Sequence, residues 1–197
     1  MKFEFNIDGQ TQVERLIRDY GSKFKSFKVV LNQIADDFYD TEKQVFGAEG
    51  AWENREKWKD LTPDYFKAKQ RLFPGTKTLE KSGALKKSLT LRSDPNAEVK
   101  IQDLSIEIDS KVKTPDGKYK LVTLHNRGWE KPEIRPKNAK ILRFEGPDGA
   151  VFAMKTRAVK VPARPPATIS EAQKARWMKF FHVYMEKSFN EVNKGGK

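Results

Sequence analysis

The chain has 197 residues and no cysteine, and its 39 lysines and arginines outnumber its 27 acidic residues, which gives a net charge of +12. This length fits one domain with its own core, and the lack of cysteine excludes disulfides and thiolate metal sites and suits reducing cytoplasm. The N-terminus lacks an apolar signal region and no apolar run approaches the roughly 20 residues that span a bilayer, so we expect a soluble protein with no membrane contact.

The first 50 residues are predicted to contain one strand and two helices. Residues 3–7 alternate apolar and polar side chains, as in a half-buried strand, and Thr11 and Glu14 have the spacing of a capping box at the start of a short helix. A longer helix is expected from Ser22 to Gly47, because apolar side chains recur there mostly at steps of three or four. We interpret this stripe as core or subunit interface. It consists of Phe24, Phe27, Leu31, Ile34, Phe38 and Val45.

Two more helices and a pair of strands are predicted next. The Thr62-Pro63 pair places a cap residue before a proline at the first helical position, which predicts a helix over 63–72. Residues 79–89 are predicted to form another helix, although Gly83 costs about 1 kcal/mol relative to alanine inside a helix. We therefore interpret Gly83 as a point where another backbone approaches closely. Alternation over 97–108 then predicts two antiparallel strands.

The last third of the chain contains the clearest turn signal. Residues Glu145–Gly149 have turn chemistry at nearly every position and predict a hairpin between strands over 141–144 and 150–154. Residues 119–125 have the composition of a strand, and residues 158–161 are expected to be extended. A terminal helix is predicted after Ser170, with an apolar side that includes Ala175, Met178, Phe181, Met185 and Phe189.

These elements predict an α+β fold, a twisted antiparallel sheet packed with helices, with a long N-terminal helix and a C-terminal helix. We expect a single domain over 1–197. Its parts would be an N-terminal strand and helices over 1–50, a core over 51–169, and a C-terminal helix with a frayed tail over 170–197.

Motifs for catalysis are incomplete in this sequence. His125-Asn126 resembles a fragment of an HNH nuclease, but His182 is the only other histidine, so a metal site would depend on carboxylates. Neither a phosphate-binding loop nor a serine nucleophile elbow is present. The acids at Asp36-Asp37 and Asp103 have no partner motif. We expect no enzyme activity, no catalytic residues, no metal site and no cofactor.

The positive charge is partly local. Between Lys67 and Arg92 the chain has eight basic residues against a single acid, Glu80, which indicates a solvated face, an acidic protein neighbour or DNA. Arg164 lies among prolines that stiffen the backbone, which favours either an interface contact or a tether within its own subunit. The candidate interface or DNA-facing residues are Lys67, Lys69, Arg71, Lys86, Lys87 and Arg164.

Five short signatures occur in order along the chain: Trp58–Pro63, Leu79–Leu85, Leu124–Gly128, Ile134–Lys137 and Val161–Pro166. Together they resemble the phage virion morphogenesis family, the Mu-like tail completion proteins, over about residues 46–169. Asn126, Pro166 and the early position of Thr62 depart from the family pattern. We interpret the shared positions as structural, with Trp58 and Leu61 stapling the start of the helix after Thr62. The candidate structural residues are Trp58, Leu61, Gly83, His125, Gly128, Pro162 and Pro165.

The resemblance implies a short helix at Tyr119–His125, where the residues alone suggest a strand. It further implies a structural protein of the phage neck, which assembles as a homo-oligomeric ring, expected to have six subunits, and completes the tail for joining to the head. Its partners would be connector, tail terminator or tube proteins, with non-specific contact to genomic DNA in the channel. It would be located in the virion and, during assembly, in the host cytoplasm. The alternative is a non-specific nucleic-acid-binding protein that uses the basic region over 67–92.

Overall fold

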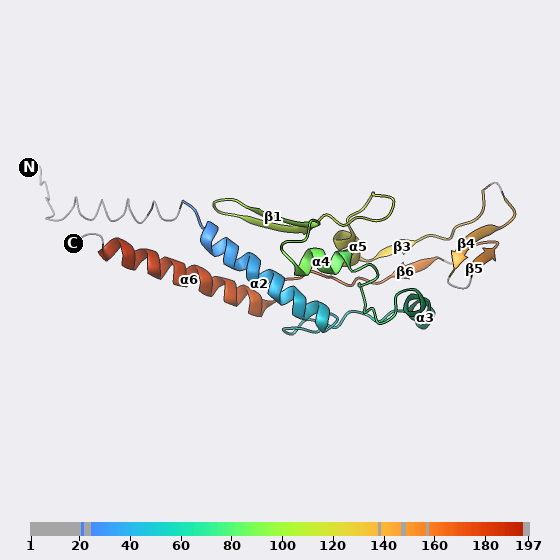
Figure 1. Cartoon of the computed structure of the whole chain (residues 1–197), viewed down its shortest axis with the longest axis horizontal. Helices are drawn as coiled ribbons and strands as arrows, with labels where there is room; N and C mark the ends of the chain where they lie inside the picture. The colour runs from blue at the N-terminus through green and yellow to red at the C-terminus, as the bar shows by residue number, and fades with distance from the viewer. Residues whose placement is uncertain (1–20, 22–24, 138, 147–148, 157, 195–197) are drawn as a thin grey trace, which may run out of the picture. The chain divides into compact units, whose positions relative to one another are not determined.

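Figure 1 shows the computed structural model of the chain, which describes residues 21, 25–137, 139–146, 149–156 and 158–194. The described elements are helices and short strand pairs, so the predicted α+β class is confirmed. The strand expected over 3–7, the helix before Gly21 and the Ser22 cap lie outside the described residues.

The described chain divides into two compact units. The first contains the described residues up to Asp37, the segment Val99–Ile108 and the residues from Glu171 onward. The second contains Phe38–Glu98 and Asp109–Ser170. The long helix α2, Lys28–Gly47, contributes residues to both units.

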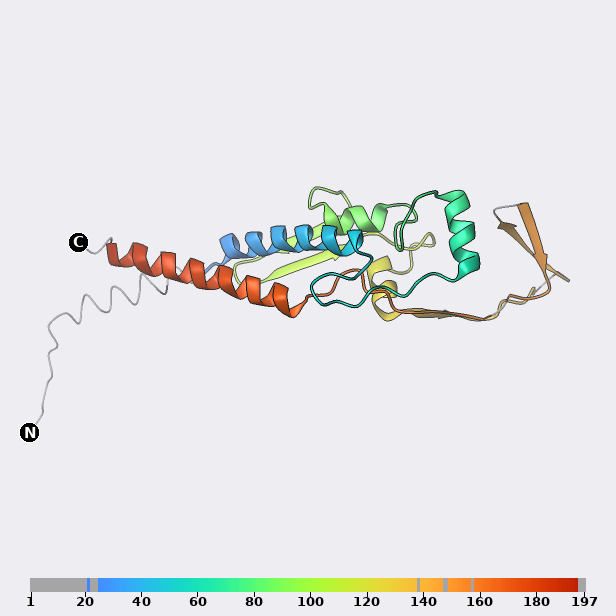
Figure 2. The same ribbon diagram turned by 90° about the horizontal axis from the view of Figure 1, so that it is seen from below.

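The core of the first unit lies between α2 and the terminal helix α6, Glu171–Lys194. Val30, Leu31 and Ile34 are buried there, and Ile101 and Ile106 complete the cluster from a strand pair. Figure 2 shows this strand pair running alongside the two helices. From α6 this cluster receives Trp177, Phe180, Phe181 and Tyr184. The apolar stripe of α2 is therefore covered by its own chain, which removes the reason for interpreting it as a subunit interface.

The buried side of α6 differs from the predicted one. The expected apolar side included Met178 and Phe189, which are exposed, whereas Trp177 and Tyr184 face the core. Trp177 was missed because it lies outside the stripe counted through Ala175, Met178 and Phe181. In the structure its indole nitrogen donates to Asp37 Oδ2 at 2.7 Å, so the ring can be packed without leaving a donor unsatisfied.

The core of the second unit collects residues from the end of α2 and from α4, Ala84–Thr90. Phe46 and Trp58 meet edge to face with ring centroids 5.1 Å apart. Leu85 and Leu89 of α4 complete this buried cluster. Two further helices belong to the unit, α3 over Pro63–Leu72 and α5 over Leu121–Arg127. The helix implied for the Tyr119–His125 segment is thus confirmed in place of a strand.

Two details of these helices correct the sequence predictions. Helix α3 begins at Pro63 as expected, but Thr62 makes no side-chain cap hydrogen bond. Helix α4 begins only at Ala84, because Gly83 has φ +73°, a left-handed conformation that interrupts a helix. A Cβ placed on Gly83 would meet no heavy atom within 4 Å, so the predicted close approach of a second backbone is wrong.

The strands form three separate two-stranded sheets within the described part of the chain. Strand β1, Ala97–Ile101, pairs with β2, Ile106–Ser110, and β3, Trp129–Lys131, pairs antiparallel with β6, Val159–Val161. The predicted hairpin forms β4, Leu142–Gly146, and β5, Gly149–Ala153, in antiparallel register. The sheet expected as one piece is therefore divided among three strand pairs.

Candidate functional site

Three of the five signatures come together in the second unit. We call Trp58, His125, Gly128, Arg164 and Pro165 the signature node. Trp58 is buried, and its Nε1 donates to the carbonyl oxygen of Pro165 at 2.8 Å across 107 residues of sequence. Its indole therefore fastens two signatures together as well as filling the core, and it does not staple the start of α3 as expected.

Arg164 connects the same two signatures in the opposite direction, from its side chain to the backbone after Trp58. Its Nε and Nη2 donate to the carbonyl oxygens of Lys59 and Asp60 at 2.5 and 2.9 Å, and only 6% of the residue is exposed. Burial lowers the pKa of its guanidinium, and the charges of Tyr65 and Asp60 oppose this effect. Arg164 is therefore a tether within its own chain, and the expectation that it faces a partner or DNA is corrected. Both acceptors are backbone carbonyl oxygens.

Gly128 lets the third signature approach the last one. It has φ +69° at the end of α5, and a Cβ there would lie 2.7 Å from the carbonyl oxygen of Val161 and 2.8 Å from the nitrogen of Ala163. Such distances are too short for any side chain, so only glycine fits. The chain then continues into β3, which pairs with β6 immediately before Pro162. Close backbone approach is thus found at Gly128 and not at Gly83.

His125 supports the node through its backbone and through the packing of its ring. Its carbonyl oxygen accepts a hydrogen bond from the Arg164 backbone N–H at 2.8 Å, and its ring meets Trp129 edge to face. The buried Nδ1 has no hydrogen-bond partner among the described residues. Burial, and secondly the charge of Arg164, lower the pKa of His125 to about 4. The imidazole is therefore neutral at pH 7 and acts as packing and backbone support.

The remaining signature residues have local roles or lie elsewhere. Leu85 belongs to the buried core beside Trp58, and Leu61 is half-buried. Pro162 stands between the two backbone atoms that crowd Gly128. The signature at Ile134–Lys137 lies outside the node, where the Ile134 N–H donates to Thr156 Oγ1.

The basic candidates do not form one exposed surface. Lys69 is 5% exposed, and its ammonium donates to the carbonyl oxygens of Lys77 and Thr76. Burial lowers its pKa. Lys86 forms an ion pair with Glu80 at 2.8 Å. Lys69 is therefore corrected to a buried structural residue. The exposed members of the set are Lys67, Arg71 and Lys87.

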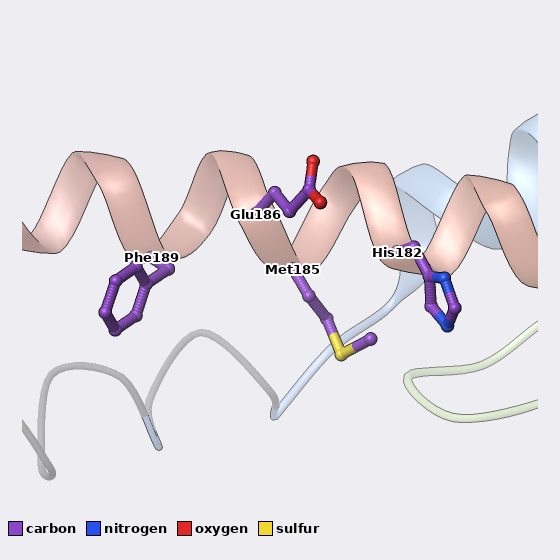
Figure 3. Close-up of a pocket in the computed structure, with 4 residues that line it drawn as sticks. All are labelled: His182, Met185, Glu186 and Phe189. Carbon is purple, nitrogen blue, oxygen red and sulfur yellow. The ribbon is translucent and has the colours of Figure 1, made fainter.

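The structure contains one hollow beside the node and another on α6. A small cavity of about 230 Å³ adjoins it, lined in part by Trp58, Pro165 and the cations Arg55, Lys57 and Lys59. Lys57 is paired with Asp60, and Arg55 with the buried Glu42 at 3.0 Å. A second, open hollow lies along α6 in the first unit, where it is formed by His182, Met185, Glu186 and Phe189, as Figure 3 shows.

Sequence reasoning missed two buried polar contacts. Glu42 is fully buried, and burial raises its pKa to about 7, although the hydrogen bond from Arg55 opposes that shift. Asp37, for which the sequence shows no partner motif, accepts from Arg176 Nε at 2.9 Å as well as from Trp177. The helical period showed where each acid lies along α2, but nothing in the sequence identified its distant partner.

No family model matches the chain, and no curated protein or solved structure matches it significantly. Within the part of the chain that the structure describes, no group of three or more histidine or acidic side chains is placed to hold a metal ion. None of the described helices is both long and apolar enough to cross a bilayer.

Proposed function

We propose that this protein is a structural component of a phage neck, which associates with the tail and completes it for joining to the head. The observation that carries the proposal is the signature node. Three short motifs that resemble those of tail completion proteins meet in one hydrogen-bonded and largely buried cluster. Motifs that matched by chance would be expected at separate places in the fold.

The chemistry of the node supports a structural role for these motifs. The indole of Trp58 and the guanidinium of Arg164 donate to backbone carbonyls, and His125 is held in its neutral form. Gly128 removes a side chain so that two backbones can meet. Each group thus fixes one chain segment against another, as a protein that works through its surfaces requires.

The proposed function includes association as a ring of six, through exposed side chains of α3 instead of the apolar stripe of α2. The stripe of α2 is internal, whereas α3 leaves Tyr65, Phe66 and Leu72 about half exposed and buries only Lys69. Exposed aromatic side chains in such numbers favour a protein interface. The alternative, nucleic-acid binding through residues 67–92, is weakened because Lys69 and Lys86 are already bound within the chain.

Deleting the gene from the phage that carries it tests the proposal. We expect lysates with separate filled heads and tails, and expect purified protein added to such a lysate to restore joined, infectious particles. Negative-stain images of the purified protein, with and without tails, would show whether it forms rings. Normal infectious particles from the deletion mutant would overturn the proposal.

A further inference from the structure

The segment between β3 and β6 contains a two-stranded ribbon, β4–β5, whose apolar side chains are exposed. Val151 and Phe152 are consecutive residues of β5 and therefore point to opposite faces of the ribbon. They are 52% and 60% exposed, and Met154 just beyond them is 77% exposed. Since side chains on both faces are in solvent, neither face of the ribbon is covered at this position.

The edges of the ribbon are also unpaired. Among the described strands, β4 and β5 pair only with each other, in the register Leu142–Ala153 to Gly146–Gly149. An isolated two-stranded hairpin is at best marginally stable in water, and exposed edges readily accept another strand or surface. The ribbon is thus built as an element that gains its stability from a neighbour.

Charge indicates the chemistry of that neighbour. Residues 129–161 contain eight basic and four acidic residues, a net charge of +4. Glu130 is paired with Lys160, and Glu133 with Arg135 and Lys155. Lys137 and Lys140 are exposed, and they form no ion pair with any described residue. The unpaired positive charge on this segment therefore comes shortly before β4 in the sequence, in the same segment as the exposed apolar side chains of β5.

Pairing between the ribbons of two copies of this chain is disfavoured. Each copy has a net charge of +4 over residues 129–161, so two ribbons would repel each other. Nucleic acid would match the charge, but Val151, Phe152 and Met154 would then stay in water or face phosphates. A protein surface with an apolar cleft and acidic residues at its rim satisfies both requirements.

The geometry points to the β4–β5 ribbon as the docking arm that inserts into an apolar cleft, rimmed by acidic side chains, on a different protein. This inference rests on the proposed function, which makes that protein a neighbouring component of the tail. Phe152 and Val151 would fill the cleft from the two faces of the ribbon, and Lys137 and Lys140 would meet its acidic rim.

Tails purified from the deletion mutant provide the probe. The full chain and its variants are mixed with these tails, and the bound fraction is measured after sedimentation. We expect Phe152→Ser combined with Val151→Thr, and separately Lys137→Glu combined with Lys140→Glu, to weaken binding at least about tenfold. Because the ribbon contributes nothing to either buried core, both variants should keep the wild-type melting temperature.

Matched controls come from α6. Met178→Ser with Val183→Ser removes two exposed apolar side chains, and Lys179→Glu with Lys187→Glu reverses two exposed charges. Both controls should bind tails as the wild type does. A loss in the controls equal to that in the ribbon variants would show a general effect of surface composition and overturn the docking arm.

The outcomes separate the two proposals. If the wild-type chain binds tails and the ribbon variants bind equally well, the docking arm is overturned and the proposed function stands. If the wild-type chain binds neither tails nor heads, the proposed function is overturned, and the assignment of the partner fails with it. Ribbon variants that lose self-association or duplex binding, but still bind tails, would identify a second copy or nucleic acid as the partner of the ribbon and overturn the inference.

Discussion

Trp58 and Arg164 hold the same two chain segments together from opposite sides. The indole of Trp58 donates to the carbonyl oxygen of Pro165, and the guanidinium of Arg164 donates to the carbonyl oxygens of Lys59 and Asp60. Each side chain thus reaches the backbone next to the other residue. Because both connections join the same segments, we expect their loss to affect folding as one unit, with effects that are not additive.

Replacing Trp58 with phenylalanine tests the polar half of this contact. The ring can still pack against Phe46, but the Pro165 carbonyl oxygen loses its donor in a largely buried position. We expect a loss of about 1–2 kcal/mol in the free energy of unfolding, against about 3–5 kcal/mol for Trp58→Ala. Denaturation in urea measures both. A phenylalanine variant as stable as wild type would show that the hydrogen bond contributes nothing.

Arg164→Lys tests the fork geometry of the guanidinium. A single ammonium cannot reproduce the two donors that reach Lys59 and Asp60. We expect a loss of about 1–3 kcal/mol in the free energy of unfolding. Arg135→Lys is the matched control, because Arg135 is largely exposed and should change stability very little. Equal stability of the two variants would contradict the tether.

Alanine at Gly83 and at Gly128 separates two reasons for a glycine. Both residues have positive φ, so each substitution should cost about 1 kcal/mol in backbone strain. Only at Gly128 does the new Cβ collide with backbone atoms, and we expect about 2 kcal/mol or more in addition. Melting temperatures of the two variants compare them directly. An equal decrease would refute the close packing of Gly128 against Val161 and Ala163.

The neutral His125 should make the protein sensitive to acid. Its pKa falls from an ordinary 6.5 to about 4 on folding, so the unfolded chain binds the proton first. The stabilisation is therefore complete above pH 6.5 and is lost as the pH falls toward 4, by up to about 3 kcal/mol. Glu42, whose pKa is raised from 4.5 to about 7, contributes the opposite slope over part of this range.

The difference between the wild type and His125→Gln isolates the histidine, because the slope from Glu42 is common to both. We expect the stability difference, measured by denaturation at pH 7.5 and pH 4.5, to shift in favour of the glutamine variant at the lower pH. A difference that does not change with pH would mean that His125 is not buried in its neutral form.

Local signals predicted the elements whose ends depend on local chemistry. Pro63 marks the start of α3, Ser170 precedes α6, and the turn residues of Glu145–Gly149 produced the hairpin with strands close to the expected bounds. The start of α4 was misplaced because the pattern of leucines continues through Gly83, whereas the backbone does not. A periodic pattern shows which side chains could share a face of a helix, but it cannot show where a residue adopts a left-handed backbone conformation and interrupts that helix.

The composition of the node was only partly predictable. Its members were found by resemblance, but the contacts between the first and last signatures span more than 100 residues of sequence, as the 107-residue separation of Trp58 and Pro165 illustrates. Lys69 shows the limit most clearly, since a lysine is normally expected in solvent. Its burial depends on carbonyl oxygens of Thr76 and Lys77 that become available only when the following loop folds.

The free edges of the β4–β5 ribbon also limit how the purified protein can be kept. At neutral pH the positive charge of the ribbon segments opposes edge-to-edge pairing between the ribbons of two copies. Near the isoelectric point, about pH 9.7, that repulsion vanishes while the edges stay open. Alkaline buffers and high salt should therefore drive this protein into edge-to-edge precipitates, whereas neutral, low-salt storage should leave it dispersed.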